Sequence, residues 1–370
     1  MFYLKSINLN NFRCFESKKI EFSPNINILY GQNAVGKTSV LEGIAYLGIL
    51  KSFRDGKDDE IIRNGENYFF VSGDFNDDED KKSLNIVVSY NELGKKVKKN
   101  SYIYQKMSDY IGFFNVISFD PGDLDLIKGA PIERRKFLNV NISQIDKNYM
   151  LSLMKYNKIL KKRNEYLKLT ENNKIDYDYL ETLSALLEDE AINIIRKREE
   201  FIRNINDYVN EAALKITKGK ERVKITYSPN ISIDYLKKDN KNRIKNDVLL
   251  KKTNFGPHKD DVIIQINGKD ADSFASQGQI RTAVISIKIG LSDYMKNINN
   301  KQIILLDDVF SELDMNRQSE LLEVLSKGCQ IFITSTDISN INQAILDKSN
   351  LIEFRKDENV WVFSKKTIKN

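Results

Sequence analysis

The sequence predicts an α/β fold that carries an inserted antiparallel helical hairpin. A short apolar run at 26–30 is followed by a glycine-rich loop and then by helical spacing of apolar residues from 38 to 50. A second apolar run, 303–306, is uninterrupted, as in a strand buried on both faces of a sheet. Between these runs, apolar residues from 138 to 208 recur every three or four positions, which is typical of long amphipathic helices.

Length and composition set the broad class. The chain has 370 residues, which exceeds one ordinary domain, and it is 41% hydrophobic and 30% charged. Its net charge of +6 permits a polyanionic partner without establishing one. Two distant cysteines, Cys14 and Cys329, and a single histidine, His258, exclude a disulfide framework and a histidine-based metal cluster. No apolar run approaches the roughly 20 residues that cross a bilayer, so we expect a cytoplasmic protein without a membrane partner.

The chain is expected to form an α/β head in two halves, with the hairpin between them. The expected segments are a first half with a β-rich subdomain (1–130), a helical hairpin domain (131–220) and a second half (221–370). Two helices of about 35 residues would make the hairpin about 50 Å long. In the last segment, Asn267-Gly268 after an alternating run predicts a β-hairpin turn.

The glycine-rich loop fits the P-loop pattern at each required position. Its residues are Gly31, Gln32, Asn33, Ala34, Val35, Gly36, Lys37 and Thr38. The glycines let successive backbone N–H groups face phosphates, and the next helix points its N-terminus at the charge. Lys37 is expected to reach the β- and γ-phosphates and Thr38 to hold Mg²⁺. This loop between a strand and a helix predicts binding of ATP with Mg²⁺.

An acidic pair follows the second apolar run. Asp307 stands where a carboxylate holds Mg²⁺ beside a P-loop, and Asp308 stands where a general base would polarise the attacking water. Aspartate is one methylene shorter than glutamate, so we expect slow hydrolysis, with ATP acting as a switch. Thr334-Ser335-Thr336 occupies the place of the switch histidine of transporter ATPases, which also indicates weak hydrolysis.

Two further motifs indicate an ABC-type ATPase head. The tetrapeptide Ser276-Gln277-Gly278-Gln279 precedes a helix and lies before the acidic pair, as the ABC signature does. There the serine, the glycine N–H and the helix N-terminus contact the γ-phosphate held by another subunit. Ser311-Glu312-Leu313-Asp314 matches the D-loop, so Asp314 is also expected at this interface. Composite sites of this kind predict an ATP-dependent homodimer.

Beyond these motifs, the sequence resembles the RecF family of bacterial recombination and replication-repair proteins over nearly its whole length. The residues that carry the resemblance include Asn11-Phe12-Arg13, Lys51-Ser52-Phe53-Arg54, Phe119-Asp120-Pro121, Arg134 to Leu138, Phe255 to Asp261 and Phe274 to Arg281. The resemblance implies an ATP-dependent dimer on double-stranded and gapped DNA that helps mediator proteins of the RecO/RecR type load recombinase onto single strands. The family usually has Arg where Lys259 stands and Asp where Asn139 stands, which leaves both roles open.

DNA contacts are expected from basic residues of the hairpin. The candidates are Lys158, Lys161, Lys162, Arg163, Arg196, Lys197 and Arg198. Phosphate contacts of this kind weaken steeply with salt and carry no sequence preference. A solvated helix face is the alternative for each residue. For His258 the alternatives are a nucleotide or interface role and a structural turn, and for Arg134-Arg135 they are a phosphate contact and a solvated helix start.

Two other classes share this type of head. Chromosome-organising ATPases of the SMC class need hundreds of residues between the two halves of the head, whereas about 80 residues form the hairpin here. Nucleases of the overcoming-lysogenisation-defect class need an acidic metal site after the head, and no such cluster follows Asp314 in the sequence.

Overall fold

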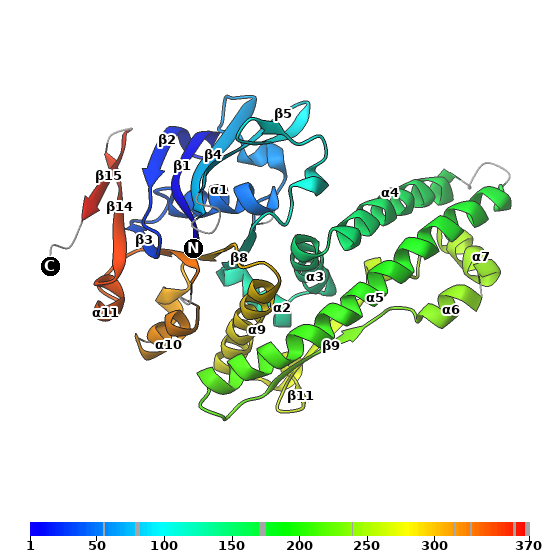
Figure 1. Cartoon of the computed structure of the whole chain (residues 1–370). Coiled ribbons are helices and arrows are strands. Elements are labelled where there is room, and N and C mark those ends of the chain that lie inside the picture. Colours follow the sequence, from blue (N-terminus) through cyan, green and yellow to red (C-terminus); the bar gives the residue numbers. More distant parts are fainter. Residues whose placement is uncertain are drawn as a thin grey trace. The chain divides into compact units, whose positions relative to one another are not determined.

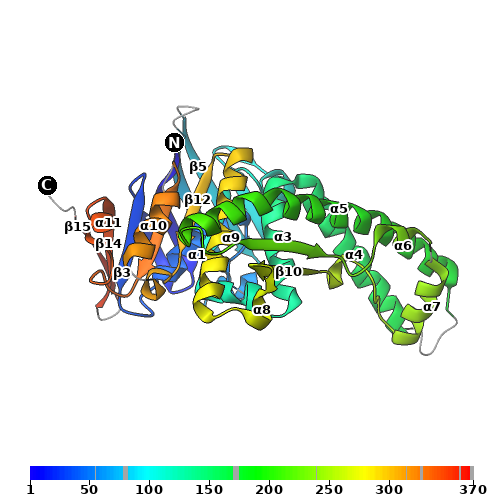
Figure 2. The same ribbon diagram turned by 90° about the horizontal axis from the view of Figure 1, so that it is seen from below.

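The computed structural model describes residues 1–54, 56–77, 82–169, 175–238, 240–313, 315–325, 328–357 and 360–366. The chain divides into two compact units, the first made of Met1–Asp123 and Leu291–Asn370 and the second of Leu124–Gly290. Figures 1 and 2 show that the first unit holds the larger sheets and the second the long helices.

The first unit contains an antiparallel sheet in the order β2-β1-β4-β5-β6-β7. Its strands are β1 (Phe2–Phe12), β2 (Phe15–Glu21), β4 (Tyr68–Asp77), β5 (Lys82–Asn91), β6 (Gly94–Lys99) and β7 (Tyr102–Ile103). Apolar residues alternate along β1 and β4, and their buried side packs against helix α1 (Lys37–Ile49). The predicted β-rich subdomain is therefore present, and it covers the P-loop helix (Figure 1).

The second sheet of this unit has the order β15-β14-β3-β13-β12-β8. Its strands are β3 (Ile26–Gly31), β8 (Asn115–Phe119), β12 (Gln302–Leu306), β13 (Gln330–Ser335), β14 (Ser349–Asp357) and β15 (Val360–Lys366). All neighbours pair in parallel except β14 and β15. The predicted buried strand is β12, whose apolar residues are fully inaccessible. β8 belongs to this sheet and not to the antiparallel one.

Short elements complete the first unit. They are the helices α10 (Met315–Leu325) and α11 (Gln343–Leu346) and the 3₁₀ turns η1 (Asp58–Ile61), η2 (Met107–Asp109), η3 (Pro121–Leu124) and η5 (Phe310–Glu312). The last residue of η3 already belongs to the second unit.

The second unit is built around the predicted helical hairpin. Its elements are α2 (Asp125–Lys128), α3 (Pro131–Ile145), α4 (Lys147–Leu169), α5 (Tyr177–Ile216), β9 (Val223–Ser228), α6 (Ile233–Lys238), α7 (Asn240–Leu250), η4 (Pro257–Lys259), β10 (Asp261–Ile266), β11 (Lys269–Asp270), α8 (Ala271–Phe274) and the start of α9 (Gln277–Ile298). Helices α4 and α5 run side by side, with α6 and α7 near the free end of the pair (Figures 1 and 2). The predicted turn at 170–174 lies outside the described residues.

The hairpin helices differ from the expected lengths. The first is interrupted at Asp146, whose extended backbone ends α3 and whose Oδ1 accepts a hydrogen bond of 2.9 Å from the N–H of Tyr149. Asp146 therefore caps a new helix, because its side chain satisfies one of the N–H groups that a helix start leaves free. As a result α4 has only 23 residues, whereas α5 has 40 and is about 60 Å long.

The boundary of the hairpin unit also lies later than expected, at Gly290 and not at residue 220. The reason is that β9 packs on α5, while β10 pairs with β9 and packs on α3. Asn206 of α5 pairs with the backbone of Ile225 like a neighbouring strand, accepting from its N–H at 2.8 Å and donating to its carbonyl at 2.7 Å. The predicted turn after β10 is confirmed, since Asn267 and Gly268 both have positive φ angles.

Two buried ion pairs tie the helices of this unit to the segment that follows them. Arg198 of α5 is 1% exposed and lies 2.8 Å from Asp260, while Arg163 of α4 is 2% exposed and lies 2.8 Å from Asp247. Arg198 also donates to the carbonyl of Pro257 and to Asn139 Oδ1. Buried charges of this kind are tolerated only when they are paired and hydrogen-bonded.

In the part of the chain that the structure describes, no helix combines the length and the apolar character needed to span a membrane.

The Arg198–Asp260 pair gives a stability prediction. Arg198→Met leaves Asp260 buried without its cation, so we expect the free energy of unfolding to fall by about 3–5 kcal/mol. Chemical denaturation followed by circular dichroism measures this change. Arg196→Met, at an exposed position of the same helix, is the control and should change stability little. Equal stability of the two variants would contradict the proposed importance of the pair.

Candidate nucleotide site

The P-loop joins β3 to α1 and is shaped by two glycines. Gly31 has a φ of 143°, and a Cβ there would lie 2.1 Å from the carbonyl oxygen of Phe354 on β14. Gly36 has a φ of 93° and caps α1. The curled loop places Lys37 Nζ 2.7 Å from the carbonyl oxygens of Gly31 and Gln32. Burial lowers the pKa of Lys37, and the nearby aspartates partly oppose this shift.

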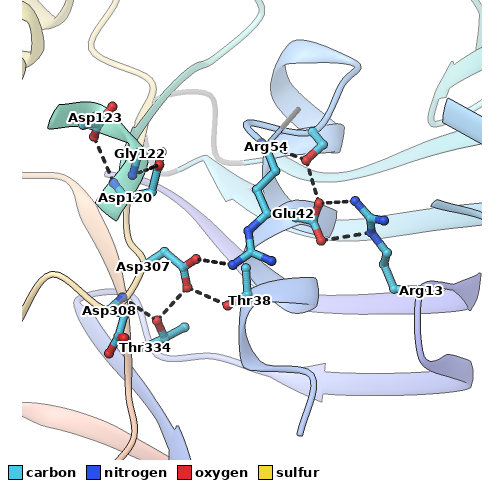
Figure 3. A network of polar contacts seen from close by, with 11 residues as sticks. Arg13, Thr38, Glu42, Arg54, Asp120, Gly122, Asp123, Asp307, Asp308 and Thr334 are labelled. Carbon is cyan, nitrogen blue, oxygen red and sulfur yellow. Dashed lines mark hydrogen bonds and ion pairs between the residues drawn. The ribbon is translucent and has the colours of Figure 1, made fainter. Parts of the chain in front are cut away.

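The carboxyl edge of the parallel sheet brings the other polar groups to the loop. Strands β3, β13, β12 and β8 are neighbours and end at this edge, which is where ligands bind in open α/β sheets. Asp307, directly after β12, is 2% exposed. Its Oδ1 accepts hydrogen bonds of 2.8 Å from the hydroxyls of Thr38 and Thr334 (Figure 3). Burial raises the pKa of Asp307, although the hydrogen bonds from both hydroxyls act in the opposite direction.

Asp308 is oriented by an unusual backbone conformation. Its φ of 55° is left-handed, and its N–H donates to Thr334 Oγ1 at 2.8 Å. Thr334 therefore touches both aspartates, and their side chains leave the chain in different directions (Figure 3). Lys37, Asp307 and Asp308, the three residues predicted to be catalytic, line the same cleft.

The cleft has room for a nucleotide and suitable groups for Mg²⁺. Its volume is about 640 Å³, within the range of about 300–1,000 Å³ that is usual for ligand pockets. The Thr38 hydroxyl and the Asp307 carboxylate are oxygen donors, which Mg²⁺ prefers. No group of three or more His, Cys, Asp or Glu side chains suited to a metal occurs in the described residues. Mg²⁺ commonly takes one or two carboxylates and completes its shell with phosphates and water.

Sequence reasoning missed one charged network beside the cleft. Glu42 of α1 is 2% exposed and accepts two hydrogen bonds from Arg13, at 2.6 and 3.1 Å. Ser52 donates to the same carboxylate at 2.6 Å and accepts from the Arg54 N–H at 3.0 Å. Arg54 reaches Asp307 at 3.5 Å (Figure 3). The available signal was an acid at position 42 within the apolar face of a helix.

The signature tetrapeptide begins α9. Ser276 Oγ accepts from the Gln279 N–H at 3.3 Å, and Gln279 Oε1 accepts from the Ser276 N–H at 3.0 Å, which is a capping box. Ser276, Gln277 and Gly278 are exposed at the start of a 22-residue helix. Their predicted contact with nucleotide on another subunit stays a prediction. Asp314 of the predicted D-loop lies outside the described residues.

Comparison with known proteins decides the family. A family model described as an AAA domain matches residues 6–215. The chain is 35% identical to the DNA replication and repair protein RecF of Halalkalibacterium halodurans, an alignment that covers 95% of this chain and 97% of that protein. The chain belongs to the RecF family. RecF of Lactococcus lactis subsp. lactis is 37% identical, over 91% and 94% of the two chains.

Solved structures agree with the RecF assignment. A structure described as the recombination mediator protein RecF with ATP in the RecFOR pathway matches with a TM-score of 0.87 and 32% identity, over 99% of this chain and 98% of that one. The Smc head domain of Pyrococcus furiosus matches with a TM-score of 0.57 and 14% identity, which shows a shared fold. The predicted ABC-type head and the resemblance to the RecF family are confirmed.

The predicted DNA-binding residues of this RecF-family chain divide into two groups. Lys158, Lys161 and Lys162 on α4 and Arg196 on α5 are exposed. Lys197 is half-buried and pairs with Asp146 and Glu200. Arg163 and Arg198 were wrong candidates, because both are buried in ion pairs inside the unit. Helical periodicity alone does not distinguish them from their exposed neighbours.

The family-like residues with open roles lie around the buried Arg198–Asp260 pair. Arg134 forms two hydrogen bonds with Asp261, and Arg135 donates to the carbonyl of Asp260. Asn139 Oδ1 accepts from both Tyr149 and Arg198, which an aspartate oxygen would do equally well. These contacts favour structural roles for the three residues.

The structure also favours a structural role for His258. Its Nε2 lies 3.1 Å from the carbonyl oxygen of Thr253, so this nitrogen carries the proton, and Nδ1 accepts from the Tyr156 hydroxyl at 2.6 Å. Burial lowers the pKa of His258 and keeps the ring neutral at neutral pH. Lys259 is exposed and its Nζ lies 3.2 Å from Asn254 Oδ1.

Proposed function

We propose that this chain is an ATP-dependent DNA-binding protein of recombinational repair and replication restart. The observation that carries the proposal is the joining of Thr38 of the P-loop helix to Asp307 and Thr334 at one sheet edge, beside a cleft large enough for a nucleotide. The solved RecF–ATP relative supports ATP as the ligand. Thr38 and Asp307 would hold Mg²⁺, which would neutralise charge on the phosphates.

The nucleotide would also join two copies of the chain. The exposed N-terminus of α9 at Ser276 offers free N–H groups and a positive helix dipole, which suit a phosphate. We infer that this turn contacts the γ-phosphate bound by the P-loop of a second copy, with Gln277, Gly278 and Gln279 and the D-loop residue Asp314 at the same interface. The pair would then hold double-stranded or gapped DNA.

Mediator proteins of the RecO/RecR type are the proposed partners, since the structural relative is placed in the RecFOR pathway. A chromosome-organising role like that of Smc proteins is less well supported. The hairpin helices α4 and α5 have 23 and 40 residues, and the described chain therefore lacks the long coiled-coil arm that this role needs.

Dimerisation tests the proposal directly. We expect the wild-type chain to become dimeric with Mg²⁺ and ATP, as measured by analytical ultracentrifugation with and without duplex DNA. Ser276→Arg should stay monomeric while it still binds ATP, because a bulky cation would block the exposed turn. Lys37→Ala should lose ATP binding and dimerisation together.

Ser232→Arg is the matched control for Ser276→Arg. Ser232 is also an exposed serine whose hydroxyl accepts from a helix-start N–H, that of Tyr235, in the same unit. This variant should dimerise like the wild type. A wild-type chain that stays monomeric at high concentration with Mg²⁺, ATP and DNA would refute the composite site.

DNA binding is expected to depend on the exposed lysines of α4. Replacing Lys158, Lys161 and Lys162 by Gln should weaken duplex binding and lower the slope of log affinity against log salt by roughly one to three. Fluorescence anisotropy at several salt concentrations measures this. The control replaces Lys237, Lys238 and Lys245 by Gln, which removes the same charge from α6 and α7. Equal losses in the two variants would show an effect of net charge alone.

Slow hydrolysis is expected from the short side chain of Asp308. Asp308→Glu should raise the steady-state ATPase rate, by roughly tenfold if the longer carboxylate reaches the attacking water. Asp307→Asn, which weakens the proposed Mg²⁺ site, should lower the rate. An unchanged or lower rate in Asp308→Glu would contradict Asp308 as the general base.

A further inference from the structure

The carboxylate of Asp307 in the nucleotide cleft contacts one cation, Arg54, and is the proposed ligand of a second, Mg²⁺. Asp307 is the proposed Mg²⁺ ligand, and its Oδ2 also lies 3.5 Å from Arg54 Nη2. Asp307 is almost fully buried, whereas the side chain of Arg54 is 54% exposed and can move outward. Two cations at one carboxylate repel each other, so binding of one weakens binding of the other.

The segment that carries Arg54 is anchored to the P-loop helix. Ser52 Oγ accepts from the Arg54 backbone N–H at 3.0 Å and donates to Glu42 at 2.6 Å. Glu42 stands four residues after Thr38 in α1, so both side chains lie on one face of the helix. That face therefore presents a hydroxyl to Asp307 and a carboxylate to the Arg54 segment.

Glu42 is itself held rigidly. Both of its oxygens accept from Arg13, whose Nη1 also donates to the carbonyl of Glu60 at 2.9 Å. On the other side of the segment, Asp58 pairs with Lys95 at 2.8 Å and accepts from the Tyr46 hydroxyl. Ser52 before Arg54 and residues 58–60 after it are thus each held by side-chain contacts, which restricts where the Arg54 side chain reaches.

We propose that Arg54 competes with Mg²⁺ for Asp307, and that Glu42 and Ser52 are positioning residues that hold Arg54 at that carboxylate. The proposal rests on the proposed function, because it requires Mg²⁺ and nucleotide at this cleft. The arrangement raises the Mg²⁺ concentration needed for nucleotide binding. It also links occupation of the metal site to release of the arginine, which then becomes available to a phosphate group.

The experiment is a Mg²⁺ titration of binding of a fluorescent ATP analogue at fixed nucleotide concentration. The quantity measured is the Mg²⁺ concentration at half-maximal binding. Arg54→Ala should lower it about two- to fivefold, the range expected for loss of a partly exposed ion pair. Arg54→Lys retains a cation and should lie closer to the wild type. Nucleotide affinity at saturating Mg²⁺ is measured separately, because loss of a phosphate contact would appear there.

Ser52→Ala tests the anchor. It should lower the half-maximal Mg²⁺ concentration in the same direction as Arg54→Ala, and the double variant should match Arg54→Ala, since a residue that acts only through another adds nothing once that residue is gone. Ser6→Ala is the matched control: Ser6 is also a buried serine of the first unit, and its hydroxyl donates to Asp74 at 2.9 Å. It should leave the Mg²⁺ dependence unchanged.

The outcomes distinguish competition at Asp307 from the proposed function of the chain. An unchanged Mg²⁺ dependence in Arg54→Ala, with normal nucleotide binding by the wild type, would overturn the competition and leave the proposed function intact. A shift in Ser52→Ala no larger than in Ser6→Ala, or a double variant with fully additive shifts, would overturn the role of the anchor. A wild-type chain that binds no ATP with Mg²⁺ would overturn both proposals.

Discussion

The buried carboxylate of Asp307 is the constraint around which the first unit is organised. A carboxylate that is 2% exposed must be hydrogen-bonded, and here the hydroxyls of Thr38 and Thr334 meet this need. These hydroxyls come from the helix after β3 and from β13, while Asp307 follows β12. The order β3-β13-β12 in the sheet therefore places a residue of the middle strand between loop and acid. The same geometry forms the cleft, so that stability and ligand binding depend on one set of contacts.

The second unit uses buried charge for a different purpose. Arg163 and Arg198 join the hairpin helices to the segment that follows them, through Asp247 and Asp260. These pairs attach the segment up to Asp260 to the hairpin helices, within the unit that extends to Gly290. The exposed basic residues of the hairpin, among them Lys158, Lys161 and Lys162 of α4 and Arg196 of α5, are not engaged in these pairs. Helix α9 begins in this unit with the signature serine and ends in the first unit, so one helix belongs to both.

The segments that carry the resemblance to the RecF family do not all lie at the nucleotide cleft. Arg13 and Arg54 lie at the cleft, whereas Arg134 and Asn139 make hydrogen bonds beside the buried Arg198–Asp260 pair of the hairpin unit. Residues of the family-like segments therefore have two kinds of role: some line the nucleotide cleft and others stabilise the fold. The contacts of each residue show which role it has.

The sequence alone determined the P-loop, the buried strand before Asp307 and the helical hairpin, because each depends on local periodicity or on a short run of fixed residue types. Tertiary structure decided the rest. Arg163 and Lys162 are adjacent and both positively charged, yet of the two only Arg163 meets a buried acid. Arg198 pairs with Asp260, 62 residues further along the chain. Asp146 likewise ends α3 and caps α4, which the periodicity of the apolar residues does not predict. Pairing over such distances is set by how helices and strands pack, which no local pattern contains.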